Sequence, residues 1–142
     1  MTSTGSIDPP DTSDLASILS RLVADVDVPL SDWPPFLPEP EALGLLREGG
    51  YLSLPEGIPL LDPGLIQSAR SRSASDWPRH LRVYQVIGST NAVLMEMATE
   101  NGVDGQVRLA ELQSQGRGRR GRNWYSPFGA NLALSMGFHA RR

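Results

Sequence analysis

The segment with the clearest chemical character is a short basic loop at residues 116–122, whose sequence is GRGRRGR. Arginine carries planar, permanently charged donors that match two oxygens of a phosphate or carboxylate at once. Glycine lets the backbone approach a ligand closely and adopt a positive φ. The composition of this segment, called the basic loop below, therefore predicts binding of a phosphate or nucleotide.

The same composition has a second interpretation, which is a solvated loop or an Arg-Gly patch that binds RNA. Such Arg-Gly tracts are usually long, whereas this one lies between two segments with the alternation of β-strands. The loop lacks the Lys-Ser/Thr ending of a P-loop and the spacing of a Rossmann fingerprint. A conventional kinase or dehydrogenase is therefore disfavoured.

A second polar group, Ser89, Thr90 and Asn91, follows a predicted strand and precedes a predicted helix. Hydroxyl and amide groups at such a turn can receive a polar ligand together with the free amides of the helix. Helix capping is the commoner role of these residue types. Trp124 and Tyr125 have two interpretations as well, because they could stack on a base or cover the core.

Regular elements must position these groups. The pattern predicts a strand at residues 82–87, then a helix whose apolar face ends at Asn101-Gly102. Residues 106–113 alternate as in a half-buried strand, and residues 131–138 alternate again beyond the basic loop. The predicted order is therefore strand, helix, strand, basic loop, strand.

The first half of the chain predicts smaller elements. Residues 1–12 are polar and Pro-rich, which predicts a disordered lead. Apolar residues at helical spacing predict a helix from Ser13 or Asp14 to Val23, and a second helix is expected from Glu39 to Arg47 before Gly49-Gly50. A strand at 51–54 and a third helix from Asp62-Pro63 complete a reduced winged-helix-like region over residues 13–70. Residues 71–80 read as a linker.

Composition excludes several classes of function. There is no Cys, so neither a disulfide framework nor a thiolate zinc site is available. His80 and His139 lie far apart and receive no role. No segment has the length and apolarity of a membrane helix, and a cytoplasmic protein is expected. Residues 1–64 carry about −9 and residues 65–142 about +6, all of the positive charge being Arg.

Three blocks, read together, resemble the biotin protein ligases, also called biotin-[carboxyl-carrier protein] ligases. They are residues 87–91 (IGSTN), 110–122 (AELQSQGRGRRGR) and 124–132 (WYSPFGANL). A weaker match at residues 50–55 and 59–61 is similar to the segment that joins the winged-helix and catalytic domains of that family. Residues 81–142 would accordingly form the N-terminal part of the catalytic domain.

The resemblance implies a two-step reaction. Biotin and ATP with Mg²⁺ give biotinyl-AMP, and a lysine of the biotin carboxyl-carrier protein of acetyl-CoA carboxylase then takes the biotin. Two sets of site residues follow by the same resemblance: the biotin contacts would be Ser89, Thr90, Asn91, Gln113, Arg117, Gly118 and Arg119, and the adenylate contacts would be Arg117, Arg119, Arg120 and Trp124. No metal ligand is assigned.

The implied fold is α/β to α+β, with a mixed sheet flanked by helices. The family lysine would lie in a strand beyond residue 142, and this sequence contains no Lys at all. We therefore identify no catalytic residue and expect negligible turnover from these 142 residues alone. The strand at 131–138 would expose an open edge, which favours aggregation or pairing with a second copy.

Two other classes of function stay open. A biotin-responsive DNA-binding regulator needs a basic recognition helix, whereas the first half of this chain is acidic and rich in Pro. An Arg-Gly nucleic-acid-binding module predicts salt-sensitive RNA binding that is indifferent to biotin. The three matched blocks favour the ligase.

Overall fold

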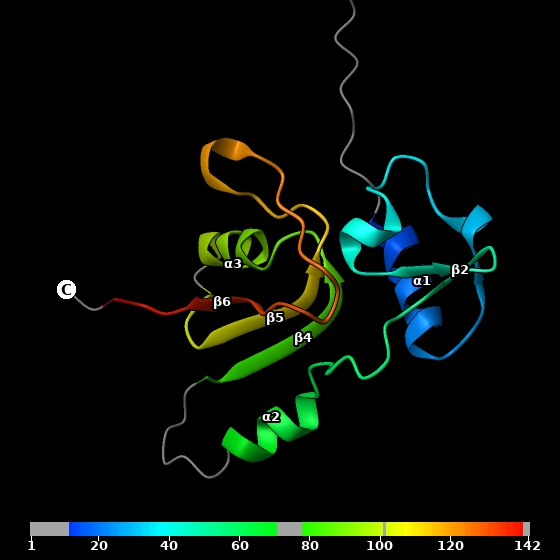
Figure 1. The fold of residues 1–142 in the computed structure, drawn as a ribbon. Coiled ribbons are helices and arrows are strands. Elements are labelled where there is room, and N and C mark those ends of the chain that lie inside the picture. The colour runs from blue at the N-terminus through cyan, green and yellow to red at the C-terminus, as the bar shows by residue number, and fades with distance from the viewer. Residues whose placement is uncertain (1–11, 71–77, 101, 141–142) are drawn as a thin grey trace, which may run out of the picture.

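The computed structural model describes residues 12–70, 78–100 and 102–140 (Figure 1). The predicted lead at residues 1–12 falls almost wholly outside the described residues, and so does most of the predicted linker at 71–80. The chain is a small α/β structure with two three-stranded sheets. In the described part, no helix has the length and apolarity that crossing a membrane requires.

The N-terminal unit, residues 12–54, combines one α-helix with a small antiparallel sheet. Helix α1 (Thr12–Val23) confirms the predicted helix and buries four of its apolar side chains: Leu15, Ile18, Leu19 and Leu22. The strands follow as β1 (Val28–Pro29), β2 (Leu46–Glu48) and β3 (Tyr51–Ser53), in the sheet order β1-β3-β2. Two short 3₁₀ helices, η1 (Leu30–Asp32) and η2 (Pro40–Leu43), lie between β1 and β2.

The prediction of a second helix from Glu39 to Arg47 is wrong. A single 3₁₀ turn, η2, begins there at Pro40 and stops at Gly44, which adopts the left-handed conformation with φ +82°. The chain then enters β2, and Gly49-Gly50, both at positive φ, form the turn of a β-hairpin with β3. These two glycines, which the sequence pattern predicts as a helix stop, therefore form a hairpin turn.

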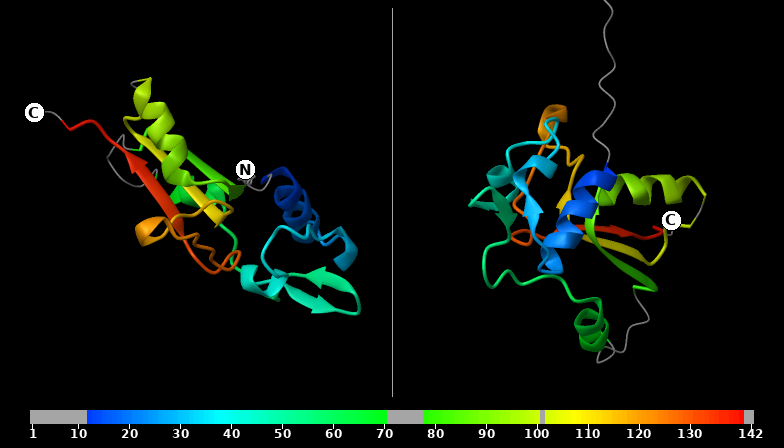
Figure 2. Two further views of the ribbon diagram at one scale, coloured as in Figure 1. Left: turned by 90° about the horizontal axis from the view of Figure 1, so that it is seen from above. Right: turned by 90° about the vertical axis from the view of Figure 1, so that its right-hand side faces the viewer.

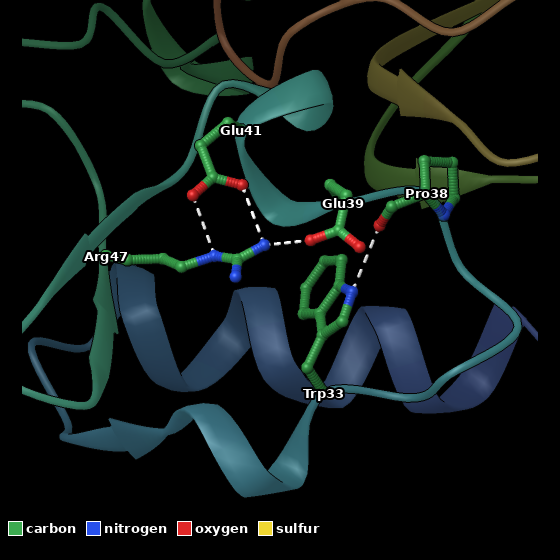
Figure 3. Close-up of polar contacts among 5 residues, drawn as sticks. All are labelled: Trp33, Pro38, Glu39, Glu41 and Arg47. Atoms are coloured by element: carbon green, nitrogen blue, oxygen red, sulfur yellow. Dashed lines mark hydrogen bonds and ion pairs between the residues drawn. The ribbon is translucent and has the colours of Figure 1, made fainter.

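Side-chain contacts hold the segment around η2 (Figure 3). The guanidinium of Arg47 bonds the carboxylates of both Glu39 and Glu41, and the bond to Glu39 raises the pKa of Arg47. The indole of Trp33 donates to the carbonyl of Pro38 at 3.0 Å. The ion pairs are partly exposed and contribute little stability, but they fix the direction of the chain through η2.

The second part of the chain is a mixed sheet in the order β4-β5-β6. Strand β4 (His80–Ile87) pairs parallel with β5 (Gln106–Gln113), and β5 pairs antiparallel with β6 (Ala133–Gly137). Helix α3 (Thr90–Thr99) connects β4 to β5, and helix α2 (Pro63–Arg70) precedes the sheet. The predicted order of strand, helix, strand, basic loop and strand is confirmed.

Strand β5 differs from the half-buried strand that its alternation predicted. Every residue from Val107 to Leu112 is buried, including the charged Arg108 and Glu111. Arg108 points toward α3, where one Nη lies 3.3 Å from the sulfur of Met97. On the other face, the carboxylate of Glu111 accepts from the backbone amide of Leu61. Residues 107–112 are all buried because other segments of the chain cover both faces of β5. The local alternation of apolar residues does not encode that covering.

One hydrophobic core joins the two parts of the chain. Leu112 at the end of β5 and Phe128 beyond the basic loop lie in the same buried cluster as α1 and η2. The N-terminal unit consequently sits beside the sheet, at the end where β5 leads into the basic loop (Figure 2). The division into regions 13–70 and 81–142 stays a prediction, and the core extends across it.

Candidate functional site

A cavity of about 610 Å³ opens where α3 begins and β5 ends. It draws on four separate segments of the chain: the start of α3, the end of β5, the basic loop and β6. The residues that line it are Ser89, Thr90, Asn91, Ala92, Gln113, Gln115, Arg117, Trp124, Leu132, Ala133, Leu134 and Ser135. A strand-to-helix turn and a basic loop distant in sequence thus face one space.

At the start of α3, capping and cavity lining occur together. Ser89 has extended backbone and its Oγ accepts from the amide of Ala92 at 3.3 Å, so it is the N-cap of α3. The capping interpretation is therefore confirmed for Ser89. Asn91, one residue into the helix, is exposed and has no hydrogen bond of its side chain to another described residue. Its amide is available to a ligand.

Gln113 organises the polar floor of the cavity. Its Oε1 accepts from the amide of Thr90 at 2.8 Å and from the Thr90 hydroxyl at 3.1 Å. The Thr90 hydroxyl also lies 2.8 Å from the hydroxyl of Ser135 on β6. Because its oxygen is occupied, the Gln113 amide presents its N–H donors, which suit a carbonyl or carboxylate oxygen.

Backbone contacts close the base of the basic loop. The amide of Trp124 donates to the carbonyl of Gly116 at 2.8 Å, and the amide of Gly118 donates to that of Arg122 at 2.7 Å. Near the tip, Arg120 has φ +62° within the short 3₁₀ helix η3 (Arg119–Gly121). The loop is therefore a small folded hairpin and not an extended tract.

The arginines of the loop are available for a ligand. Residues 117, 119, 120 and 122 are all exposed, and within the described part of the chain their side chains form no hydrogen bond or ion pair. By contrast, Arg21, Arg47 and Arg79 each form an ion pair with an Asp or Glu side chain. Four unpaired cations within residues 117–122 favour an anionic ligand of more than one charge.

The structure brings together most of the residues predicted from sequence. Those that line the cavity are Ser89, Thr90, Asn91, Gln113, Arg117 and Trp124. Gly118, Arg119 and Arg120 do not line it and lie farther along the same loop. Their predicted contacts would require the tip of the loop to approach the cavity.

Residues of β6 were missed by the sequence analysis. Ser135 reaches the cavity because the antiparallel register sets it opposite Arg108, on the face covered by α3. The alternation of apolar residues 132, 134, 136 and 138 already implied that the intervening positions face the other way. What was missing was the register, which depends on the tertiary pairing.

Metal ligands are not assembled in the described residues. No group of three His, Asp or Glu side chains is close enough there to hold an ion. The cavity is lined by neutral polar, apolar and Arg side chains, without a carboxylate. The residues present therefore do not fit a protein-held Mg²⁺, and we derive no step through a metal.

Comparison with known proteins gives consistent relationships. Residues 83–142 match the model of the Biotin/lipoate A/B protein ligase family. The chain is 48% identical over 87 residues to the "Bifunctional ligase/repressor BirA" of Salmonella typhimurium, which covers 61% of this chain and 25% of that protein. It is 40% identical over 80 residues to the "Biotin--[acetyl-CoA-carboxylase] ligase" of Mycobacterium tuberculosis, with 56% and 30% covered.

The "Bifunctional ligase/repressor BirA" of Escherichia coli is also similar, at 46% identity over 87 residues. The chain spans about a quarter of the length of the first of these relatives.

Proposed function

We propose that this chain, whose residues 83–142 match the model of the biotin/lipoate A/B protein ligase family, supplies the biotin- and adenylate-holding part of a biotin protein ligase. In the proposed first reaction, a carboxylate oxygen of biotin attacks the α-phosphorus of ATP and pyrophosphate leaves. In the second, a lysine amine of the carrier protein attacks the acyl carbon and AMP leaves.

The cavity is the observation that carries this proposal. Three blocks that resemble the family, at residues 87–91, 110–122 and 124–132, all contribute side chains to one space of about 610 Å³. A volume of this size suits a ligand of the size of a small cofactor. Neutral polar side chains line this space together with Arg117 of the basic loop, which suits a ligand with a polar head and a phosphate.

For biotin, we propose contacts from the floor and the loop. Ser89, Thr90, Asn91 and Gln113 would meet its polar ring, because their hydroxyl and amide groups match a carbonyl oxygen and two N–H groups. Arg117, Gly118 and Arg119 would hold its carboxylate. Of these seven residues, Gly118 and Arg119 depend on the loop folding over the ligand.

For the adenylate, we propose Arg117, Arg119, Arg120 and Trp124. Attack of a carboxylate on a phosphate brings negative charges together, and fixed guanidinium groups reduce that repulsion. Trp124 is half-exposed beside the cavity, where its ring could stack on a base. Enclosure of biotinyl-AMP by the loop would also protect the mixed anhydride from water.

The finer assignments are proposals as well. The carrier protein would be that of acetyl-CoA carboxylase, a substrate named for the Mycobacterium tuberculosis relative. The N-terminal unit would be a reduced winged helix in which the β2–β3 hairpin is the wing. Operator binding is not proposed, because α1 and α2 each contain a single basic residue and residues 1–64 are acidic.

Isothermal titration with a non-hydrolysable biotinyl-AMP analogue tests the proposal. We expect saturable binding that Arg117→Gln weakens by about tenfold or more, since a charge-assisted contact is lost. Arg82→Gln, which removes an exposed Arg of β4 outside the cavity, is the matched control and should leave the affinity unchanged. Absence of binding by folded protein, or equal losses in both variants, would refute the proposal.

Turnover is predicted separately from binding. The chain has no Lys, the residue type that the resemblance implies for catalysis, and Arg cannot serve as its neutral or compact equivalent. We therefore expect biotin-dependent pyrophosphate release from these 142 residues to stay at background. A clear biotin-dependent signal in that assay would contradict the prediction.

A further inference from the structure

A close backbone contact links the N-terminal unit to the segment that follows the basic loop. The amide of Phe128 donates to the carbonyl of Leu43 at 2.8 Å, and Phe128 is 1% exposed within the shared core. Beside it, Gly44 lies against Pro127 so closely that an added Cβ would stand 2.8 Å from the Cβ of Pro127. We call this contact, formed by residues 43–44 and 127–128, the latch.

Both ends of the basic loop are anchored in that core. Leu112, just before the loop, is fully buried in the cluster that contains α1, and Tyr125, just after it, packs on the same cluster. Between them the backbone bond from Trp124 to Gly116 closes the loop, with no room for a side chain at Gly116 because the Trp124 carbonyl is 2.5 Å from its Cβ position. The base of the loop is therefore held from both sides.

The tip of the basic loop makes fewer contacts than its base. Its arginines are exposed and form no side-chain bond to another described residue, and nothing described lies within 4 Å of the Cβ position of Gly121. Trp124, which lines the cavity, is only three residues from Pro127 in the latch. A short stretch of chain therefore joins the latch to a side chain that lines the cavity.

We propose that Leu43 and Gly44 are positioning residues for the basic loop, and that the N-terminal unit acts through them to hold the loop against the cavity. The function of this unit would then be to set the geometry of the anion-binding loop. That consequence for a ligand rests on the proposed function, whereas the mechanical link between the latch and the loop does not.

Hydrogen exchange of Gly44→Ala and Gly50→Ala tests the link. Both glycines have nearly the same φ, +82° and +85°, so the backbone strain of an Ala is matched. Only Gly44 has a neighbour, since nothing lies within 4 Å of the Cβ position of Gly50. We expect amide exchange in residues 116–128 to become roughly tenfold faster in Gly44→Ala and to stay at the parent rate in Gly50→Ala.

A second variant covers the case in which Gly44→Ala does not fold. Pro127→Gly removes the Cβ on the other side of the same contact, at an exposed position, and should accelerate exchange in the same segment. Exchange in β5 should stay unchanged in each variant. Equal exchange in residues 116–128 for Gly44→Ala, Pro127→Gly and the parent would overturn the proposal.

Titration with the biotinyl-AMP analogue separates the two proposals. A loss of affinity that follows the faster exchange, and is absent from Gly50→Ala, supports the positioning role. Unchanged affinity despite faster exchange would overturn the role for ligand binding. If the parent itself does not bind the analogue, the proposed function fails, and the exchange data alone still decide whether the latch holds the loop.

Discussion

Thr90, Gln113 and Ser135 form a hydrogen-bonded group that joins α3, β5 and β6 at the floor of the cavity. Gln113 has two separable roles in it, because its oxygen accepts from Thr90 while its nitrogen faces no described acceptor. A carboxamide oxygen can be replaced by a carboxylate oxygen of the same geometry, but the N–H donors cannot. A substitution of Gln113 can therefore keep the hydrogen bond that supports the fold while removing the donors proposed to bind the ligand.

We expect the substitution Gln113→Glu to preserve the stability of the fold and to weaken ligand binding. The carboxylate still accepts from the Thr90 amide, so we expect the free energy of unfolding to change by less than about 1 kcal/mol. Binding of the biotinyl-AMP analogue should fall by more than about tenfold, because two donors are lost and a negative charge meets an anion. Gln113→Leu should lower both. Tight binding by Gln113→Glu would exclude the proposed role.

Arg108 is a buried cation without a described carboxylate partner. It is 5% exposed, its guanidinium bonds Gln106 and the carbonyl of Val107, and its Nε has no partner. Burying an unpaired charge is costly, whereas an apolar residue of similar length avoids the cost. Arg108→Met should therefore raise the free energy of unfolding in urea by about 1 kcal/mol or more. A decrease would show that the charge is needed.

At the scale of elements, strand β6 is the edge of its sheet in the described part of the chain, and it carries an apolar face. The exposed side chains on that face are Leu132, Leu134, Met136 and Phe138. No charged residue occurs between Arg122 and Arg141 to protect the edge. An uncharged, apolar edge strand is a template for pairing with another strand. The edge that the sequence predicted is present, and its pairing with a second copy is a proposal.

Met136→Lys should suppress self-association. A Lys in the centre of β6 sets like charges beside each other when two copies pair, so the apparent dissociation constant should rise by about tenfold or more. Sedimentation velocity over a concentration series measures this. Met95→Lys on the exposed face of α3 makes the same chemical change away from the edge and should associate like the parent. Equal behaviour of the two variants would place the contact elsewhere.

At the scale of the whole molecule, a shared core makes the N-terminal unit and the sheet depend on each other. Phe128 belongs by sequence to the turn after the basic loop, yet it packs among α1 and η2. Glu111 likewise bonds the backbone at Leu61, 50 residues away. Removing one part would expose the buried apolar surface of the other, so the two should not unfold independently.

Phe128→Ala should destabilise both parts at once. Truncation of a fully buried Phe costs about 3–5 kcal/mol through lost burial and the cavity that remains. We expect far-UV circular dichroism and Trp fluorescence to lose signal in one coincident urea transition, shifted to lower concentration. Two separated transitions would show instead that the parts fold on their own.

The local sequence determined the types and order of most elements. Helical spacing from Leu15 to Leu22, alternation in 106–113 and the Gly-rich basic loop between strands each reflect short-range periods, which any fold must respect. The motif blocks also identified six of the residues that line the cavity, which are Ser89, Thr90, Asn91, Gln113, Arg117 and Trp124. The prediction of a helix from Glu39 to Arg47 was wrong because the same apolar spacing is compatible with a left-handed Gly44 and a hairpin turn at Gly49-Gly50.

Contacts between distant segments, including those that cover the two faces of strand β5, are determined only by the tertiary structure. Burial of Arg108 and Glu111, the register that brings Ser135 to the cavity, and the latch between Leu43 and Phe128 all join residues far apart in the chain. Such contacts are selected by packing over the whole molecule, and periodicity within a short window carries no information about them. The residue types of the basic loop thus determine which ligands it can bind. Packing in the shared core, which the local sequence does not encode, determines where the base of the loop lies.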